Sequence, residues 1–167
     1  MKLRRIGLYI SLAILWLAHA GRYYLLLVIG RGRKDVQGVR MILVRDNETV
    51  LIRHWYAPKV WTLPGGGVGK KESLEDAIRR EVQEETGFIV RSIGGVVGTY
   101  RGSLGKGDVV RVYYTSDFEG FMSFVPTMEI SIRAWFPLDN LPEDISPANR
   151  RRIEAYKSGV RGETGRW

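Results

Sequence analysis

Apolar residues in the body of the chain recur in short runs that are separated by turn-forming residues. Such runs, rich in Val, Ile and aromatic residues, predict strands. They fall at Val39–Val44, Val50–Ile52, Val60–Leu63, Ile89–Tyr100, Val109–Thr115 and Ile130–Phe136. The cluster Arg45–Glu48 between the first two runs is typical of a turn, so these two strands are expected to form a hairpin.

Two segments have the signals of helices. Residues Ser73–Thr86 show helical periodicity, with Ser73 as the N-cap and Gly87 placed to end the helix. The pair Ser146-Pro147 predicts the start of a last helix, and Gly162–Trp167 is expected to be a loose tail. Strands and helices mixed in this way over 167 residues predict one layered α/β domain.

The first of these helices carries carboxylates where apolar residues are expected. A rotation of about 100° per residue defines a buried stripe, in which Glu81 and Glu85 fall and at whose edge Glu84 lies. The apolar members of that stripe are Leu74, Ala77, Ile78 and Val82. Burying several unpaired carboxylates costs several kcal/mol per group or forces their protonation.

A divalent cation would relieve this arrangement. Oxygen ligands without cysteine or histidine favour Mg²⁺ or Mn²⁺ over Zn²⁺. An exposed helix with ion pairs to Arg79 and Arg80 would also explain the glutamates. The loop Gly65–Gly67, which leads into the helix, strengthens the first interpretation because a backbone without side chains can approach a metal or a phosphate closely.

The N-terminal segment, residues 1–34, is basic at both ends and apolar between. Ile6–Ile29 is long enough to span a bilayer as one helix, with Arg22 near one end. The triplet Ala18-His19-Ala20 also fits a signal-peptide cleavage site. A helix that packs on the domain or lies on an anionic membrane surface is the remaining interpretation. All of these alternatives stay open at this point.

Composition narrows the function classes. The net charge is +8, but eight of the 26 basic residues and only one of the 18 acidic residues lie in the first 40 positions. The body of the chain is therefore nearly neutral, and no DNA partner is expected. The absence of cysteine excludes disulfides, thiolate zinc sites and a cysteine nucleophile, and two histidines argue against a multi-histidine metal site.

The residues from Gly66 to Phe88 resemble the signature of the Nudix hydrolases. Gly66, Glu72, Arg80-Glu81-Val82, Glu84-Glu85 and Gly87 occupy the fixed positions of that signature. Phe88 stands where an aliphatic residue is usual, which is a mild departure at a packing position. The resemblance implies an α/β/α sandwich with a mixed central sheet over residues 35–160, preceded by the apolar helical segment 1–34 and followed by the tail 161–167.

The same resemblance assigns roles by position. Glu81, Glu84 and Glu85 resemble the metal ligands, joined by the backbone carbonyl of Gly65, and Mg²⁺ or Mn²⁺ is the implied cofactor. Supporting roles in the loop and helix fall to Glu72, Arg80, Gly66 and Gly87.

The general base and the substrate contacts vary within this family. Glu119 resembles an additional metal-binding or base glutamate, Glu129 is a second candidate that could also contact substrate, and Glu81 itself could serve. Arg53 could pair with phosphates, and Trp61 and Tyr100 could stack on a base. His54 is expected to be structural or exposed.

The implied activity is metal-dependent hydrolysis of a nucleoside diphosphate linked to another moiety, X, by attack of water at phosphorus. The alternatives are a binding module that keeps the fold without turnover and an enzyme acting on RNA 5′ ends. A nucleotide-type diphosphate is the expected partner. A homodimer, a cytoplasmic location and contact with an anionic membrane through residues 1–34 complete the expectations.

Overall fold

A computed structural model describes residues 37–102, 107–122, 127 and 129–167. The expectations for the N-terminal segment, residues 1–34, lie outside this range, as does most of the Gly-rich loop after Arg101. Within the described part of the chain, no helix has the length and apolar character needed to cross a bilayer.

Six strands form the main sheet in the order β7-β2-β1-β5-β4-β8. Their bounds are β1 (Gln37–Arg45), β2 (Glu48–His54), β4 (Gly95–Arg101), β5 (Val109–Thr115), β7 (Ile130–Pro137) and β8 (Glu163–Arg166). Two short strands, β3 (Ile89–Val90) and β6 (Phe118–Glu119), pair with each other. The pairs β1/β5 and β4/β8 are parallel and the other neighbours in the main sheet are antiparallel, so the expected mixed sheet is confirmed.

The predicted hairpin is present between β1 and β2. Arg45 pairs with Glu48, and the two residues between them, Asp46 and Asn47, have φ angles of 51° and 62°. Asp and Asn tolerate this left-handed conformation, and two such residues match the twist of the flanking strands. The turn residues therefore set the register of the hairpin.

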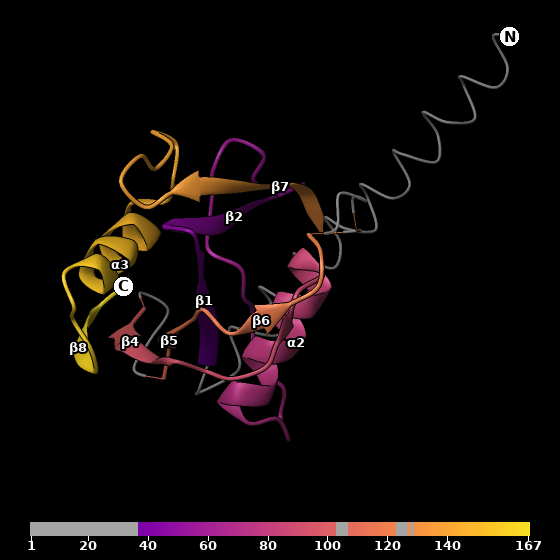
Figure 1. Ribbon diagram of the computed structural model, residues 1–167. Coiled ribbons are helices and arrows are strands. Elements are labelled where there is room, and N and C mark those ends of the chain that lie inside the picture. The colour runs from indigo at the N-terminus through magenta and orange to yellow at the C-terminus, as the bar shows by residue number, and fades with distance from the viewer. Residues whose placement is uncertain (1–36, 103–106, 123–126, 128) are drawn as a thin grey trace, which may run out of the picture. The chain divides into compact units, whose positions relative to one another are not determined.

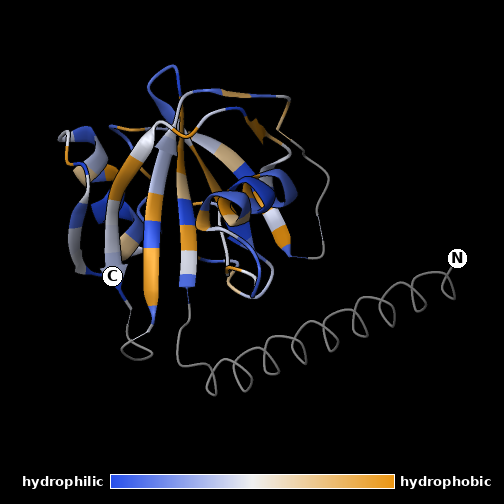
Figure 2. Cartoon of the chain, turned by 90° about the horizontal axis from the view of Figure 1, so that it is seen from below, coloured by the Kyte–Doolittle hydropathy of each residue, from blue (hydrophilic) through white to orange (hydrophobic). Residues whose placement is uncertain are grey.

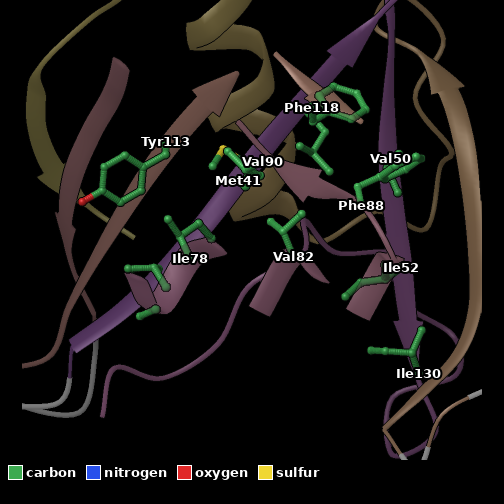
Figure 3. Packing of buried hydrophobic residues seen from close by; sticks show 13 residues of the cluster. Met41, Val50, Ile52, Ile78, Val82, Phe88, Val90, Tyr113, Phe118 and Ile130 are labelled. Atoms are coloured by element: carbon green, nitrogen blue, oxygen red, sulfur yellow. The ribbon is translucent and has the colours of Figure 1, made fainter. Parts of the chain in front are cut away.

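The sheet buries both of its faces, one under each helix. Helix α2 (Leu74–Thr86) and helix α3 (Pro147–Lys157) lie on opposite sides of the sheet (Figure 1). The central strands contain runs of consecutive apolar residues interrupted by polar ones (Figure 2), as expected for a sheet that is covered on both faces. Met41 and Ile52 pack with Ile78 and Val82 of α2 (Figure 3), while their neighbours Ile42 and Leu51 pack on the α3 side together with Ile153. Because alternate strand residues point to opposite faces, these helices enclose the sheet as an α/β/α sandwich.

Four local predictions need correction. The expected strand Val60–Leu63 is absent, because Trp61 and Thr62 form only isolated bridges, to Ile145 and Ile52. The run Ile89–Tyr100 is two strands, because the backbone turns away after Val90 and Gly94-Gly95 lie against the ring of Tyr114, where a Cβ at either glycine would come within about 3 Å of ring atoms. The expected loose tail contains β8, which its polar sequence could not reveal because backbone pairing with β4 holds it. Ser146 stands at the N-cap of α3 but its side chain makes no capping hydrogen bond.

Candidate active site

Helix α2 begins and ends where the sequence predicts. The Asp76 backbone N–H donates to Ser73 Oγ at 3.0 Å, and the Gly87 N–H donates to the Gln83 carbonyl at 3.0 Å. Gly87 has a φ of 86°, a left-handed conformation that glycine adopts without strain. The caps therefore fix which residues form the last two turns of α2, where Glu81, Glu84 and Glu85 lie.

The three glutamates differ in exposure as the helical periodicity predicts. Glu85 is 4% exposed, whereas the side chains of Glu81 and Glu84 are 12% and 61% exposed. One turn of the helix thus carries one carboxylate in the core, one that is mostly buried and one in the solvent. The inner two lie on the face that also carries Ile78 and Val82.

Glu85 is held between the glycine loop and the sheet. Its Oε2 accepts a hydrogen bond from the Gly65 N–H at 2.6 Å, and its Oε1 lies 4.0 Å from Nε2 of His54. Nε of Arg133 donates to its backbone carbonyl. Burial raises the pKa of Glu85 to about 8, although the charge of Arg40 and the Gly65 hydrogen bond act in the opposite direction. A buried carboxylate of this kind is favourable as an anion only beside further positive charge.

Arg80 connects the loop to the helix. Its Nε and Nη2 donate to the two carboxylate oxygens of Glu72 at 2.8 and 3.0 Å, a bidentate pair. Its Nη1 donates to Glu81 at 2.8 Å and to Glu84 at 3.3 Å. The Arg80 hydrogen bond holds the pKa of Glu72 near 2, well below its usual range. One guanidinium therefore orients two of the three helix carboxylates.

The glycine loop lies against β1 and under Glu81. The Val39 N–H donates to the Gly66 carbonyl and the Met41 N–H to the Pro64 carbonyl, each at 2.9 Å. Gly65 has a φ of 137°, and a Cβ there would lie within 3.0 Å of the β1 backbone. A Cβ on Gly66 would instead lie within 3.0 Å of the Glu81 carboxylate. The loop thus needs glycine at both positions, because a side chain would collide with the β1 backbone at Gly65 and with the Glu81 carboxylate at Gly66.

The donor chemistry suits a hard divalent cation. Glu81, Glu84 and Glu85 supply oxygen ligands from a single helical turn, which is the ligand type that Mg²⁺ and Mn²⁺ prefer. In residues 37–102, 107–122, 127 and 129–167, however, no three acidic or histidine side chains converge closely enough to hold an ion. Glu81 and Glu84 contact Arg80, so ion binding requires their carboxylates to rotate toward Glu85 while Arg80, fixed by its pair with Glu72, stays beside them. Glu84, which is largely exposed, is free of packing that would oppose this.

The other predicted site residues fall in different places. Glu119 lies in β6 and ion-pairs with Arg91. Glu129 precedes β7, and its backbone carbonyl accepts a hydrogen bond from the N–H of Trp55, the residue next to His54, at 3.0 Å. Arg53 ion-pairs with Asp144, and its guanidinium carbon lies 4.3 Å from the centroid of the Trp61 ring.

The expectation that Tyr100 stacks on a substrate base is not supported by its position. Tyr100 is 0% exposed, its hydroxyl donates to Glu163 at 2.7 Å, and Arg152 covers its ring. Trp61, at 7% exposed, belongs to the same α3-side core. Both aromatic residues stabilise the domain in this structure and offer little surface to a ligand.

Three basic residues around Glu85 are not assigned to the carboxylate site by the sequence argument. They are Arg40 of β1, His54 of β2 and Arg133 of β7. The alternation in β2 does place His54 on the same face as Val50 and Ile52. The alternation therefore predicts on which face of the sheet His54 lies, but it does not predict that Glu85 of α2 packs against that face.

The substitution Gly66→Ala is expected to lower kcat/KM on the order of 10²-fold, because the added methyl group displaces the Glu81 carboxylate by about an ångström or more. The fold should survive, since only the end of a side chain must move. Gly67→Ala is the matched control, because a Cβ at Gly67 meets nothing within 4 Å. Steady-state kinetics of both variants check this, and equal activities would refute the role given to the loop.

Comparison with known proteins gives a consistent result. The sequence profile of the NUDIX domain matches residues 34–156. An RNA pyrophosphohydrolase of Caulobacter vibrioides is 34% identical over 129 residues, 66% of this chain and 75% of that protein. A Bacillus subtilis (strain 168) protein, provisionally named 8-oxo-dGTP diphosphatase, is 27% identical over 124 residues, 74% of this chain and 81% of that protein.

A similar fold has been solved by crystallography. The crystal structure of a MutT NUDIX hydrolase from Burkholderia pseudomallei superposes with a TM-score of 0.64 at 30% identity, covering 74% of this chain and 98% of that chain. Some relatives are much longer, and the chain spans only 14% and 13% of the length of two of them, from Arabidopsis thaliana and Caenorhabditis elegans.

Proposed function

The chain belongs to the NUDIX family of hydrolases that act on pyrophosphate bonds, and from this premise we propose that it is a divalent-cation-dependent hydrolase of nucleoside diphosphates linked to a further moiety, X. The observation that carries the proposal is the arrangement of Glu81, Glu84 and Glu85 beside the glycine loop. The alternative of a silent binding module is less favoured, because each carboxylate of the set is present and Arg80 holds two of them.

Glu81, Glu84 and Glu85 are the residues that would hold the cation. A bound divalent ion supplies charge neutralisation at the phosphate oxygens and lowers the pKa of water. Arg80 keeps Glu81 and Glu84 on the loop side of the helix, and Glu72 keeps Arg80 in place. Arg40, whose charge favours the ionised forms of Glu81 and Glu85, is positioned to attract a substrate phosphate.

In the reaction, water adds to a phosphorus atom of the diphosphate and the anhydride P–O bond breaks. The leaving phosphate takes the bonding electron pair, and a carboxylate takes the proton of the attacking water. Of the candidate bases, Glu129 is favoured over Glu119, because its backbone is hydrogen-bonded beside His54, the neighbour of Glu85, while Glu119 ion-pairs with Arg91.

The identity of X is not part of this proposal. The similar proteins act, by their names, on RNA, on 8-oxo-dGTP and on ADP-ribose, so they have in common a nucleoside with a diphosphate linkage. An RNA 5′ end is therefore retained as one form of X. Association with an anionic membrane, a homodimer and a cytoplasmic location stay predictions.

Chromatographic detection of the two phosphorylated products, the nucleoside monophosphate and the phosphate carried by X, from a panel of such compounds tests the proposal. The panel contains nucleoside triphosphates, oxidised nucleotides, ADP-ribose, dinucleoside polyphosphates, nucleotide sugars and 5′-triphosphorylated RNA. We expect turnover of one class with Mg²⁺ or Mn²⁺ and less than 1% of that rate, on the order of a 10²-fold loss, with EDTA. Turnover that persists in EDTA would contradict the proposal. In the same assay Glu129→Gln should lower kcat more than Glu119→Gln does.

A further inference from the structure

A chain of contacts runs from the buried carboxylate to an exposed aromatic ring. Nε2 of His54 lies 4.0 Å from Oε1 of Glu85. The imidazole of His54 also contacts Tyr56, whose ring stacks on it with a centroid separation of 4.7 Å and an interplanar angle of 17°. The ring of Tyr56 thus lies one imidazole away from the carboxylate that we place at the centre of the site.

The turn after β2 fixes this ring. The Ala57 N–H donates to the His54 carbonyl at 3.1 Å, which closes a tight turn around Trp55 and Tyr56. Trp55 is anchored at two points, since its backbone N–H donates to the Glu129 carbonyl and its Nε1 to the Thr127 carbonyl, both at 3.0 Å. A ring held in this way loses little conformational entropy when a ligand packs against it.

Tyr56 is also exposed enough to contact a ligand. It is 51% exposed although one face of its ring rests on His54. The two aromatic residues that the sequence suggested for stacking do not have this property, because Trp61 and Tyr100 are 7% and 0% exposed. An exposed apolar ring next to a polar, charged site is a characteristic feature of ligand recognition.

Resting on the function proposed above, we propose that Tyr56 is the stacking surface for the base of the nucleotide substrate. A nucleotide whose diphosphate lies at Glu85 carries its base one ribose further away, within reach of this ring. Stacking on an aromatic side chain tolerates every base, because each base has a π face. Tyr56 therefore selects substrates that contain a base over simple polyphosphates, and it does not select among the bases.

The test uses binding of ligands that cannot be hydrolysed, so that it does not depend on turnover. The ligands are the α,β-methylene analogues of ADP and GDP, which carry a base, and methylenediphosphonate, which does not. Isothermal titration calorimetry with Mg²⁺ compares the wild type, Tyr56→Ala and Tyr56→Leu. The Leu variant keeps an apolar contact with His54 and protects the conclusion if the Ala variant folds poorly.

We expect Tyr56→Ala and Tyr56→Leu to weaken binding of the nucleotide analogues by roughly 5- to 100-fold relative to the wild type. Their affinity for methylenediphosphonate should stay within about twofold of the wild-type value. Tyr156→Ala is the control. It removes a partly buried tyrosine whose ring lies at a tilt against that of Tyr114 on the α3 side of the sheet, and it should change neither affinity. Equal losses for both kinds of ligand, unchanged nucleotide affinity, or a wild type that binds both kinds equally would overturn the inference.

The outcome separates this inference from the proposed function. A panel without turnover together with a selective loss of nucleotide affinity would refute hydrolysis and support the stacking surface. Turnover of one substrate class together with unchanged nucleotide affinity in both Tyr56 variants would support hydrolysis and refute the stacking surface.

Discussion

Replacing Glu84 by glutamine is expected to lower kcat by about 10²- to 10³-fold and to leave the fold intact. Glutamine keeps the size of the side chain but removes the negative charge, and a cation ligand contributes several kcal/mol of transition-state stabilisation. Because the Glu84 side chain is 61% exposed, its substitution disturbs no packing. Steady-state kinetics with Mg²⁺, together with a circular dichroism melt, measure both effects.

Glu75→Gln is the matched control for this experiment. Glu75 is an exposed glutamate in the first turn of the same helix, nine residues before Glu84. Its substitution should leave kcat within about twofold, since exposed charges of this kind contribute little. A Glu84→Gln enzyme with the activity of the control would show that Glu84 has no part in the chemistry.

Replacing Arg80 by lysine is expected to lower the affinity for Mn²⁺ and kcat by about 10- to 100-fold each, because residues that orient metal ligands typically matter to this extent. A lysine has a single ammonium group and cannot reproduce the bidentate pair with Glu72 while also contacting Glu81. Arg79→Lys is the control, since Nη1 of Arg79 donates to the carbonyls of Val90 and Arg91. Equal Mn²⁺ affinity in the two variants would argue against a positioning role for Arg80.

The same substitution has a consequence for acid stability. The pKa of Glu72 is lowered from 4.5 to about 2 by the Arg80 hydrogen bond. A carboxyl with a depressed folded-state pKa contributes stability above pH 4.5, and this contribution is lost as the pH falls toward 2. In Arg80→Lys the Glu72 pKa should rise toward 4.5, measured by NMR titration of its carboxyl carbon. A pKa that stays near 2 would contradict the assignment of its cause.

The carboxylate helix could be predicted from the sequence because its information is local. Ser73, Gly87 and the apolar spacing fix the start, the end and the buried face of α2, and these alone place Glu85 within the buried stripe and Glu84 at its edge. The hairpin of β1 and β2 was accessible for the same reason, since Asp46 and Asn47 define its turn. Capping and turn chemistry act within a few residues and need no knowledge of the rest of the fold.

The substrate side of the site could not be read in this way. Whether an aromatic residue in a strand faces a helix, the solvent or the site depends on the pairing of distant strands. Tyr100 is buried because β8 and Arg152 cover it, and β8 has no apolar pattern of its own. His54 meets Glu85 only because α2 packs on the face of the sheet to which β2 contributes. Such contacts arise from tertiary packing rather than from local sequence.

The central claim is that the glutamates of one turn of α2 share a divalent cation. Titration of Mn²⁺ followed by electron paramagnetic resonance measures this directly on the wild type and on Glu81→Gln, Glu84→Gln, Glu85→Gln and Glu75→Gln. The claim predicts that each of the first three variants binds Mn²⁺ at least about 10-fold more weakly than the wild type, while Glu75→Gln binds it equally well. Unchanged Mn²⁺ affinity in the first three variants, or a wild type that binds no Mn²⁺, would contradict it.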